Sequence, residues 1–151
     1  MGTPDFAKVC FESLLTTDNE IVGVITQPDK PKGRGYTLMP PPVKVSALEH
    51  NIPVYQPATL KDEAFAELLN ELSPELIVVV AFGKILPKNV LDYPKYGCIN
   101  VHGSLLPEYR GAAPMQRAII DGKSETGVTI MYMEKGLDTG DMLLVEKCRI
   151  E

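Results

Sequence analysis

The 151 residues are enough for one domain with a sizeable hydrophobic core and too few for two domains of ordinary size. Hydrophobic residues make up 44% and charged residues 23%, which argues against a disordered chain, and no apolar run reaches the roughly 20 residues that span a bilayer. The net charge of −5 argues against a protein that coats nucleic acid non-specifically, although a local basic segment could still contact RNA.

The cysteine content and the N-terminal residues indicate the compartment. Cys10, Cys98 and Cys148 are scattered and odd in number, which is poor material for a disulfide framework and typical of a reducing compartment. The first residues do not form a basic segment followed by an apolar core, as a secretion signal would. We therefore expect a cytoplasmic protein that does not associate with a membrane.

The first half of the chain alternates between helix-like and strand-like patterns. Residues 5–16 carry apolar side chains at helical spacing behind a Pro-Asp start, and residues 20–26 form a short β-branched run typical of a buried strand. Five prolines and two glycines between residues 27 and 42 favour an irregular segment. A short helix over residues 43–50 and a brief strand near Val54 are expected to follow.

The second half continues the alternation. A helix is predicted over residues 62–72, and the LIVVVA run at residues 76–81 is the clearest buried strand. Residues 98–102, 128–133 and 142–151 are further expected strands, and residues 114–121 form an expected helix. Strands separated by helices predict an α/β fold, doubly wound around a mostly parallel, Rossmann-like sheet, in a single domain that spans residues 1–151.

Asn100 and His102 are the first candidate site residues. Residues two apart on a strand point to the same side, so these two polar side chains share one face. Their strand runs into a Gly/Ser/Pro turn, which places them at its carboxyl end, where open parallel sheets bind ligands. The alternative is structural: Asn100 could bond nearby main chain, and His102 could be a satisfied, half-buried histidine.

Asp138 lies in a glycine-rich turn, GLDTGD at residues 136–141, whose backbone freedom can hold a carboxylate at a sharp bend. It could equally be an ordinary turn residue. The Asp-Thr-Gly triplet also occurs in aspartic proteases, but those enzymes need two such carboxylates, and that interpretation leaves Asn100 and His102 unexplained. Phosphate-loop and dinucleotide fingerprints, zinc-ligand spacing and a G-x-S-x-G elbow are all absent from the sequence.

These motifs together resemble one enzyme family. Asn100-x-His102, SLLP at residues 104–107, Arg110-Gly111 and Asp138, 36 residues after His102, are similar to the 10-formyltetrahydrofolate-dependent formyltransferases. Within that family, GTPDFA at residues 2–7, TQPDKPKGRG at 26–35, LMP at 38–40 with PVK at 42–44, and GAAP at 111–114 resemble the branch that acts on methionyl-tRNA. The resemblance covers essentially the whole chain.

The resemblance implies transfer of a formyl group from 10-formyltetrahydrofolate to the amino group of initiator methionyl-tRNA, for translation initiation, without a metal. It implies that Asn100, His102 and Asp138 are catalytic. An amide donor at Asn100 suits an oxygen that becomes negative, His102 can move protons near neutral pH, and Asp138 would orient its ring. The folate is expected to lie against the backbone around residues 82–86 and the turn from residue 134 to residue 138, which both follow strands at the same edge of the sheet. The implied folate-binding residues are Phe82, Gly83, Ile85, Leu86, Ser104, Leu105, Leu106, Pro107 and Glu134, and the implied tRNA-binding residues are Lys30, Lys32 and Arg34.

The sequence departs from the family in three places. Family members have a strand before the GTPDF turn and a C-terminal β-barrel domain that helps hold tRNA, and this chain has neither. Gly103 stands where the family more often has alanine. We therefore expect a partial catalytic domain whose sheet lacks a central strand, in a protein that is a monomer.

Two other functions remain open at this point. The chain could belong to a formyltransferase that acts on a small amine, such as glycinamide ribonucleotide or an amino-sugar nucleotide, although the TQPD loop speaks against it. It could also be an inert folate-binding fragment. The basic loop could likewise be a solvated turn without an RNA partner.

Overall fold

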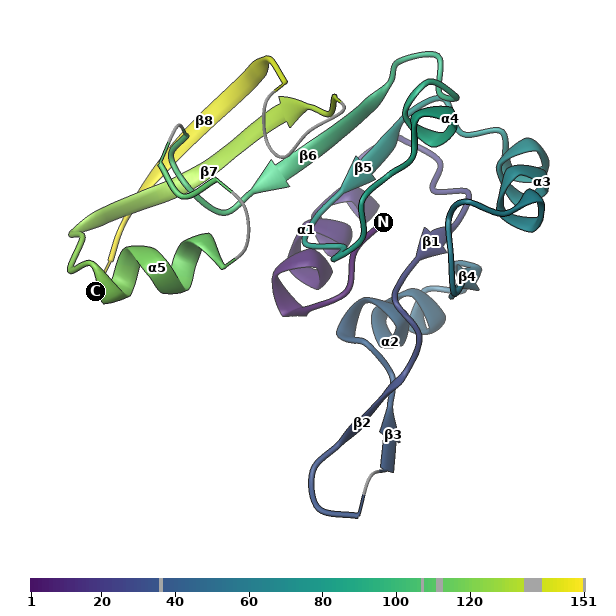
Figure 1. The fold of residues 1–151 in the computed structure, drawn as a ribbon, viewed down its shortest axis with the longest axis horizontal. Helices are drawn as coiled ribbons and strands as arrows, with labels where there is room; N and C mark the ends of the chain where they lie inside the picture. The colour runs from purple at the N-terminus through teal and green to yellow at the C-terminus, as the bar shows by residue number, and fades with distance from the viewer. Residues whose placement is uncertain (36, 107, 111–112, 135–139, 151) are drawn as a thin grey trace.

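The computed structural model of the chain describes all residues except 36, 107, 111–112, 135–139 and 151 (Figure 1). Its elements in chain order are α1 (Asp5–Leu15), β1 (Val24–Ile25), β2 (Lys30–Lys32), β3 (Thr37–Met39), α2 (Pro42–Glu49), β4 (Val54–Tyr55), α3 (Glu63–Leu72), β5 (Ile77–Val79), α4 (Lys88–Leu91), β6 (Cys98–His102), α5 (Pro114–Ile120), β7 (Glu125–Tyr132) and β8 (Met142–Arg149).

Helices cover both faces of the sheet at β5, which confirms the α/β, Rossmann-like class. β5, β6, β7 and β8 pair in that order, and β1 pairs in parallel with β4. Ile77 and Val79 of β5 pack into a cluster with α3 and α4, whereas Val80 packs into a second cluster with α1 and α2. Side chains that alternate along the β5 segment therefore reach opposite layers, as the expected doubly wound arrangement requires.

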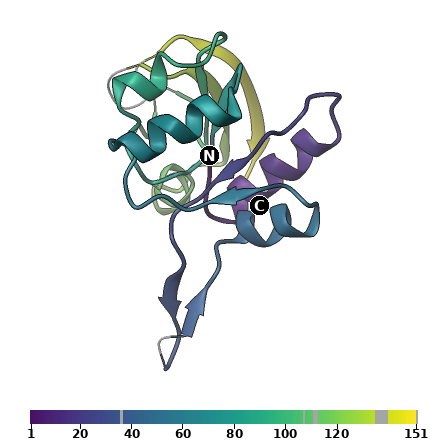
Figure 2. The same ribbon diagram turned by 90° about the vertical axis from the view of Figure 1, so that its right-hand side faces the viewer.

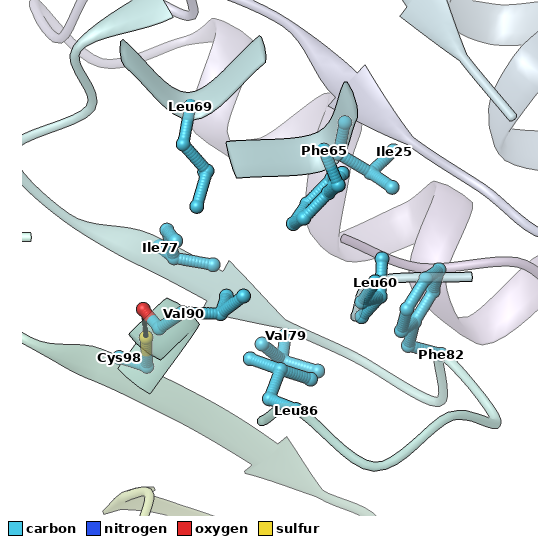
Figure 3. Close-up of a cluster of buried hydrophobic side chains, with 10 residues drawn as sticks. All are labelled: Ile25, Leu60, Phe65, Leu69, Ile77, Val79, Phe82, Leu86, Val90 and Cys98. Atoms are coloured by element: carbon cyan, nitrogen blue, oxygen red, sulfur yellow. Dashed lines mark hydrogen bonds between the residues drawn. The ribbon is translucent and has the colours of Figure 1, made fainter. Parts of the chain in front are cut away.

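The larger cluster shows why α3 forms where the periodicity predicts it (Figure 3). Asp62 caps the helix because its carboxylate accepts a hydrogen bond from the main-chain nitrogen of Phe65 at 2.9 Å. Phe65 and Leu69, one helical turn apart, are only 2% and 4% exposed. Burying one such side chain stabilises the fold by about 1.5–3 kcal/mol. The cluster comprises Ile25, Leu60, Phe65, Leu69, Ile77, Val79, Phe82, Leu86, Val90 and Cys98.

Met1 and Gly2 occupy part of the position where the resemblance predicts a missing central strand. The main-chain nitrogen of Gly2 donates to the oxygen of Ile25 at 3.0 Å, and that of Val80 donates to Met1 at 2.9 Å. Gly2 and Val80 form a parallel bridge, so two residues link β1 to β5. A cavity of about 640 Å³ continues from Met1 between residues 19–25 and 73–80.

The prediction of an irregular segment over residues 27–42 is wrong. β2 and β3 form an antiparallel hairpin in which Pro31 lies opposite Leu38. Proline is tolerated there because a two-stranded hairpin has only edge strands, where a missing N–H need not break a ladder. Gly33 and Gly35 lie in the turn with φ of 75° and 99°, which suits residues without a side chain.

The direction of the last two strands also differs from the expectation. β6 pairs in parallel with β5, but β7 runs antiparallel to β6, and β8 antiparallel to β7. The sheet is therefore mixed.

The first expected strand pairs only at Val24–Ile25, and the short helix α4 was not predicted. Within the described part of the chain, no helix is both long and apolar enough to cross a membrane.

Candidate active site

Asn100 and His102 lie on β6, as the sequence predicts. In the strand register Asn100 is opposite Val79 of β5 and Met131 of β7, and His102 is opposite Thr129. Alternation puts both on the same face as Cys98, which belongs to the cluster with α3 and α4. Asn100 is half-buried and His102 is 6% exposed, so both polar groups are largely removed from bulk water.

His102 is oriented by the turn that follows β6. Its Nε2 lies 2.8 Å from the main-chain oxygen of Tyr109. Tyr109 has φ of 56°, and its hydroxyl donates to Oδ2 of Asp121 at 2.7 Å. This hydrogen bond, then loss of solvent around the hydroxyl and the Asp121 charge, raises the pKa of Tyr109 to about 12. The Arg117 guanidinium lies 5.4 Å from the centre of the Tyr109 ring and donates to the main-chain oxygen of Arg110 at 2.7 Å.

Thr129 of β7 fastens the first part of the same turn. Its hydroxyl donates to the oxygen of Ser104 at 2.7 Å and accepts from the nitrogen of Leu106 at 3.2 Å. The Ser104 hydroxyl donates to the oxygen of Glu108 at 2.7 Å. Ser104 and Thr129 are fully buried. The Ser104 side chain therefore shapes the turn, and its hydroxyl faces the protein interior.

The residues expected to hold the folate divide into buried and exposed members. Phe82 and Leu86 are core side chains, 2% and 4% exposed, so only their main chain can meet a ligand (Figure 3). Gly83 is exposed with φ of 83°, and Ile85 is 77% exposed. Because β5 and β6 are parallel, the loops that follow them leave the sheet at the same edge. The loop at residues 82–86 and the turn at 103–106 thus leave the sheet on the same side.

The expectation that the turn beginning at Glu134 shares this edge is wrong. β7 is antiparallel to β6, with Tyr132 opposite Ile99, and the nitrogen of Met133 donates to the oxygen of Cys98 at 2.8 Å. Glu134 is exposed and follows β7 beside the start of β6, not beside its end. Asp138 and Pro107 lie outside the described residues.

The predicted tRNA-binding segment is the hairpin β2–β3. Figures 1 and 2 show it extending away from the rest of the molecule. Lys30 and Arg34 are exposed, and Lys32 is the last residue of β2. None of the ion pairs between described residues engages Lys30 or Arg34. Their charges are thus open to an anionic partner.

Sequence reasoning did not find Tyr109 or Thr129. Both act through contacts that depend on the path of the turn after β6, and no local spacing marks either residue. Among the described residues, no group of three or more histidine, cysteine, aspartate or glutamate side chains could hold a metal ion. The 640 Å³ cavity includes none of the predicted site residues, so we assign it no part in the chemistry.

Comparison with known proteins identifies the family of this chain. A family model for formyl transferases matches residues 1–151. The chain belongs to the formyl transferase family. The chain is 57% identical to the methionyl-tRNA formyltransferase of Clostridioides difficile over 151 residues, which is 100% of this chain and 49% of the relative. It is 59% identical to the enzyme of the same name from Syntrophus aciditrophicus over 150 residues, 99% of this chain and 48% of the relative.

Solved structures of a formyltransferase and a deformylase share the fold. Phosphoribosylglycinamide formyltransferase from Bacillus halodurans superposes with a TM-score of 0.75 at 23% identity, covering 99% of this chain and 78% of that one. A formyltetrahydrofolate deformylase from Pseudomonas syringae gives 0.66 at 27% identity, covering 96% and 47%. The first likeness concerns the fold alone. The chain spans about half the length of the curated relatives it matches.

Proposed function

We propose that this formyl transferase chain is the catalytic domain of a protein that moves a formyl group from 10-formyltetrahydrofolate to the amino group of initiator methionyl-tRNA. The observation that carries the proposal is the pair Asn100 and His102 at the end of β6, in a chain 57% identical to a methionyl-tRNA formyltransferase. The protein would supply formylated initiator tRNA for translation initiation. It would be a cytoplasmic monomer in which residues 1–151 form one domain.

The chemistry needs a donor for a developing negative charge and a group that moves a proton. The folate supplies a formyl group on nitrogen, and the amine of the acceptor attacks its carbon. Asn100 is suited to donate its amide hydrogen to the formyl oxygen, a contact typically worth about 3–4 kcal/mol in the transition state. The attacking amine must lose a proton and the departing folate nitrogen must gain one, and we propose that His102 transfers it.

The loop at residues 82–86 combines an exposed apolar side chain with uncovered main chain, which suits a flat ring system with polar groups on its edge. Ile85 offers an exposed apolar side chain, and Gly83 leaves its main chain uncovered. Lys84 fixes the loop because its Nζ donates to the oxygens of Pro57 and Ala58 at 3.0 and 2.7 Å. We propose that the pterin lies against this main chain, with Leu105 and Leu106 of the second loop nearby. Glu134 and Asp138 stay candidates on the strength of the family resemblance.

The hairpin β2–β3 is the proposed contact for the tRNA. Lys30 and Arg34 are exposed cations on an extension that reaches beyond the body of the domain (Figure 1). A phosphate backbone is the partner that such cations bind most readily. Lys32 carries the third charge of the same segment.

Transfer of labelled formyl from 10-formyltetrahydrofolate tests this function, with initiator methionyl-tRNA and glycinamide ribonucleotide offered as separate acceptors. The assay is run on the 151-residue chain and on the full-length protein. Label on the tRNA supports the proposal. Label only on the small amine would keep the fold and the site but replace the substrate, and no transfer to either acceptor would favour an inert folate-binding module.

A further inference from the structure

The root of the hairpin β2–β3 is closed by an ion pair between its two sides. Asp29 directly precedes β2, and Lys44 lies in the first turn of α2, which follows β3 after two prolines. Nζ of Lys44 lies 3.1 and 3.2 Å from the two carboxylate oxygens of Asp29. The side chains are 22% and 28% exposed, so the pair is partly shielded from solvent. The ion pair therefore fixes the spacing of the two chain segments that enter and leave the hairpin.

Gln56, which follows β4, joins this pair to the sheet. Its Oε1 accepts from Nζ of Lys44 at 2.9 Å, and its Nε2 donates to Oδ1 of Asp29 at 2.7 Å and to the main-chain oxygen of Gln27 at 3.1 Å. The hydrogen bond from Gln56, and after it that from Lys44, lowers the pKa of Asp29. The carboxylate therefore stays charged, and the ion pair persists at neutral pH.

Gln27 extends the connection to the loop after β5. Its Nε2 donates to the oxygen of Phe82 at 3.0 Å, and Thr3 donates to the same oxygen at 3.3 Å. A Cβ at Gly83 would lie 2.5 Å from Nε2 of Gln27, so the contact depends on glycine at that position. A continuous polar chain thus runs from Lys44 at the hairpin root to the loop proposed to hold the folate.

We propose that Gln27, Asp29, Lys44 and Gln56 form a polar bracket that holds the hairpin in a fixed orientation relative to the loop at residues 82–86. A two-stranded hairpin has little stability of its own, so its direction is set at its root. The bracket places the cations of the hairpin where they meet an RNA whose aminoacyl end lies at Asn100 and His102. This inference rests on the proposed function, and the four residues are positioning residues that do not contact the reacting atoms.

Direct phosphate binding by Lys44 is the competing role. An ammonium has three hydrogens to donate, and Lys44 has three acceptor atoms within 3.2 Å: two oxygens of Asp29 and Oε1 of Gln56. Binding a phosphate would require it to leave at least one of them. The two roles therefore predict different dependence of tRNA binding on salt.

The test measures both KM values of the full-length protein carrying Gln56→Leu or Lys44→Met. The bracket predicts that KM for initiator methionyl-tRNA rises about tenfold, the scale expected when a binding group is misplaced, while KM for 10-formyltetrahydrofolate and kcat at saturating tRNA stay within about twofold. The logarithmic salt dependence of tRNA binding has the same slope in both variants, because both loosen the same hairpin cations. Lys88→Met is the matched control, because it removes an exposed ion pair with Asp92 (2.7 Å) away from the hairpin.

A readout that needs no substrate separates this inference from the proposed function. Hydrogen exchange of the amides in the β2–β3 ladder is expected to be about tenfold faster in Gln56→Leu than in the unmodified protein or in Lys88→Met. Unchanged exchange overturns the bracket, whether or not the protein formylates tRNA. If the protein formylates tRNA and its KM for tRNA is unchanged in the variants, the bracket is also overturned. A salt slope of tRNA binding that falls by about one in Lys44→Met alone overturns the bracket as well. A lower kcat with both KM values unchanged would show a general folding defect and contradict the positioning role.

Discussion

Nε2 of His102 lies 2.8 Å from the main-chain oxygen of Tyr109, and this contact fixes the orientation of the ring and places a hydrogen on Nε2. A carbonyl oxygen only accepts hydrogen bonds, so Nε2 carries a hydrogen in every protonation state that keeps the contact. Tyr109 can present its carbonyl in this way because its main chain is in the left-handed region and its hydroxyl is bound to Asp121.

Tyr109→Phe tests this support of His102. Without the bond to Asp121 the turn is free to shift, and we expect kcat of formyl transfer to fall about tenfold with little change in either KM. Because the pKa of Tyr109 is raised to about 12, the hydroxyl keeps its proton throughout pH 6–9, and its bond is lost only as pH rises through that value. The ratio of mutant to unmodified kcat should therefore be constant over pH 6–9. An unchanged kcat would contradict the positioning of His102 by this turn.

Arg34→Ala tests the hairpin as the RNA contact. Arg34 is exposed and about one phosphate contact would be lost, so KM for tRNA should rise and the salt slope of tRNA binding should fall by about one. KM for 10-formyltetrahydrofolate should not change. Lys61→Ala removes an exposed cation elsewhere on the surface and should leave all three quantities unchanged. Equal loss of tRNA and folate binding in Arg34→Ala would count against a tRNA contact.

Gly103 and Gly127 provide a matched pair for stability. An alanine Cβ at position 103 would lie 3.2 Å from Cγ of Met115, a flexible and partly exposed side chain that can move aside. Gly103→Ala should thus raise the free energy of unfolding by up to about 1 kcal/mol, because alanine reduces the conformational entropy of the unfolded chain. The variant should keep its activity. At Gly127 the Cβ would collide with the main-chain oxygen of Glu146 in the β7–β8 ladder, so Gly127→Ala should destabilise the protein. Thermal unfolding of both variants tests these two predictions. A Gly127→Ala variant that is more stable than the unmodified protein would contradict the strand register.

Helices and buried strands could be predicted because their periodicity reflects the packing that forms them. Phe65 and Leu69 recur at helical spacing, and both side chains are core. The hairpin β2–β3 escaped prediction because its prolines and glycines are also the residues of irregular loops, and only pairing across the turn distinguishes the two. The antiparallel direction of β7 depends on where α5 returns the chain, which local pattern does not encode.

The candidate site was predicted only where it follows from alternation along one strand. Asn100 and His102 share a face of β6 because they are two residues apart. Tyr109 and Thr129 reach the same site through contacts 7 and 25 residues along the chain, set by a turn whose path the sequence pattern does not reveal. The prediction that Glu134 lies at the same edge of the sheet was wrong because it assumed that β7 is parallel to β6.

The most direct test of the central claim is transfer of labelled formyl to initiator methionyl-tRNA by the full-length protein and by its Asn100→Ala variant, at saturating folate. If the Asn100 amide stabilises the developing charge, kcat should fall roughly 10²- to 10³-fold while thermal unfolding and KM for tRNA stay close to those of the unmodified protein. A variant that transfers formyl at the unmodified rate would show that the end of β6 is not the site of the chemistry.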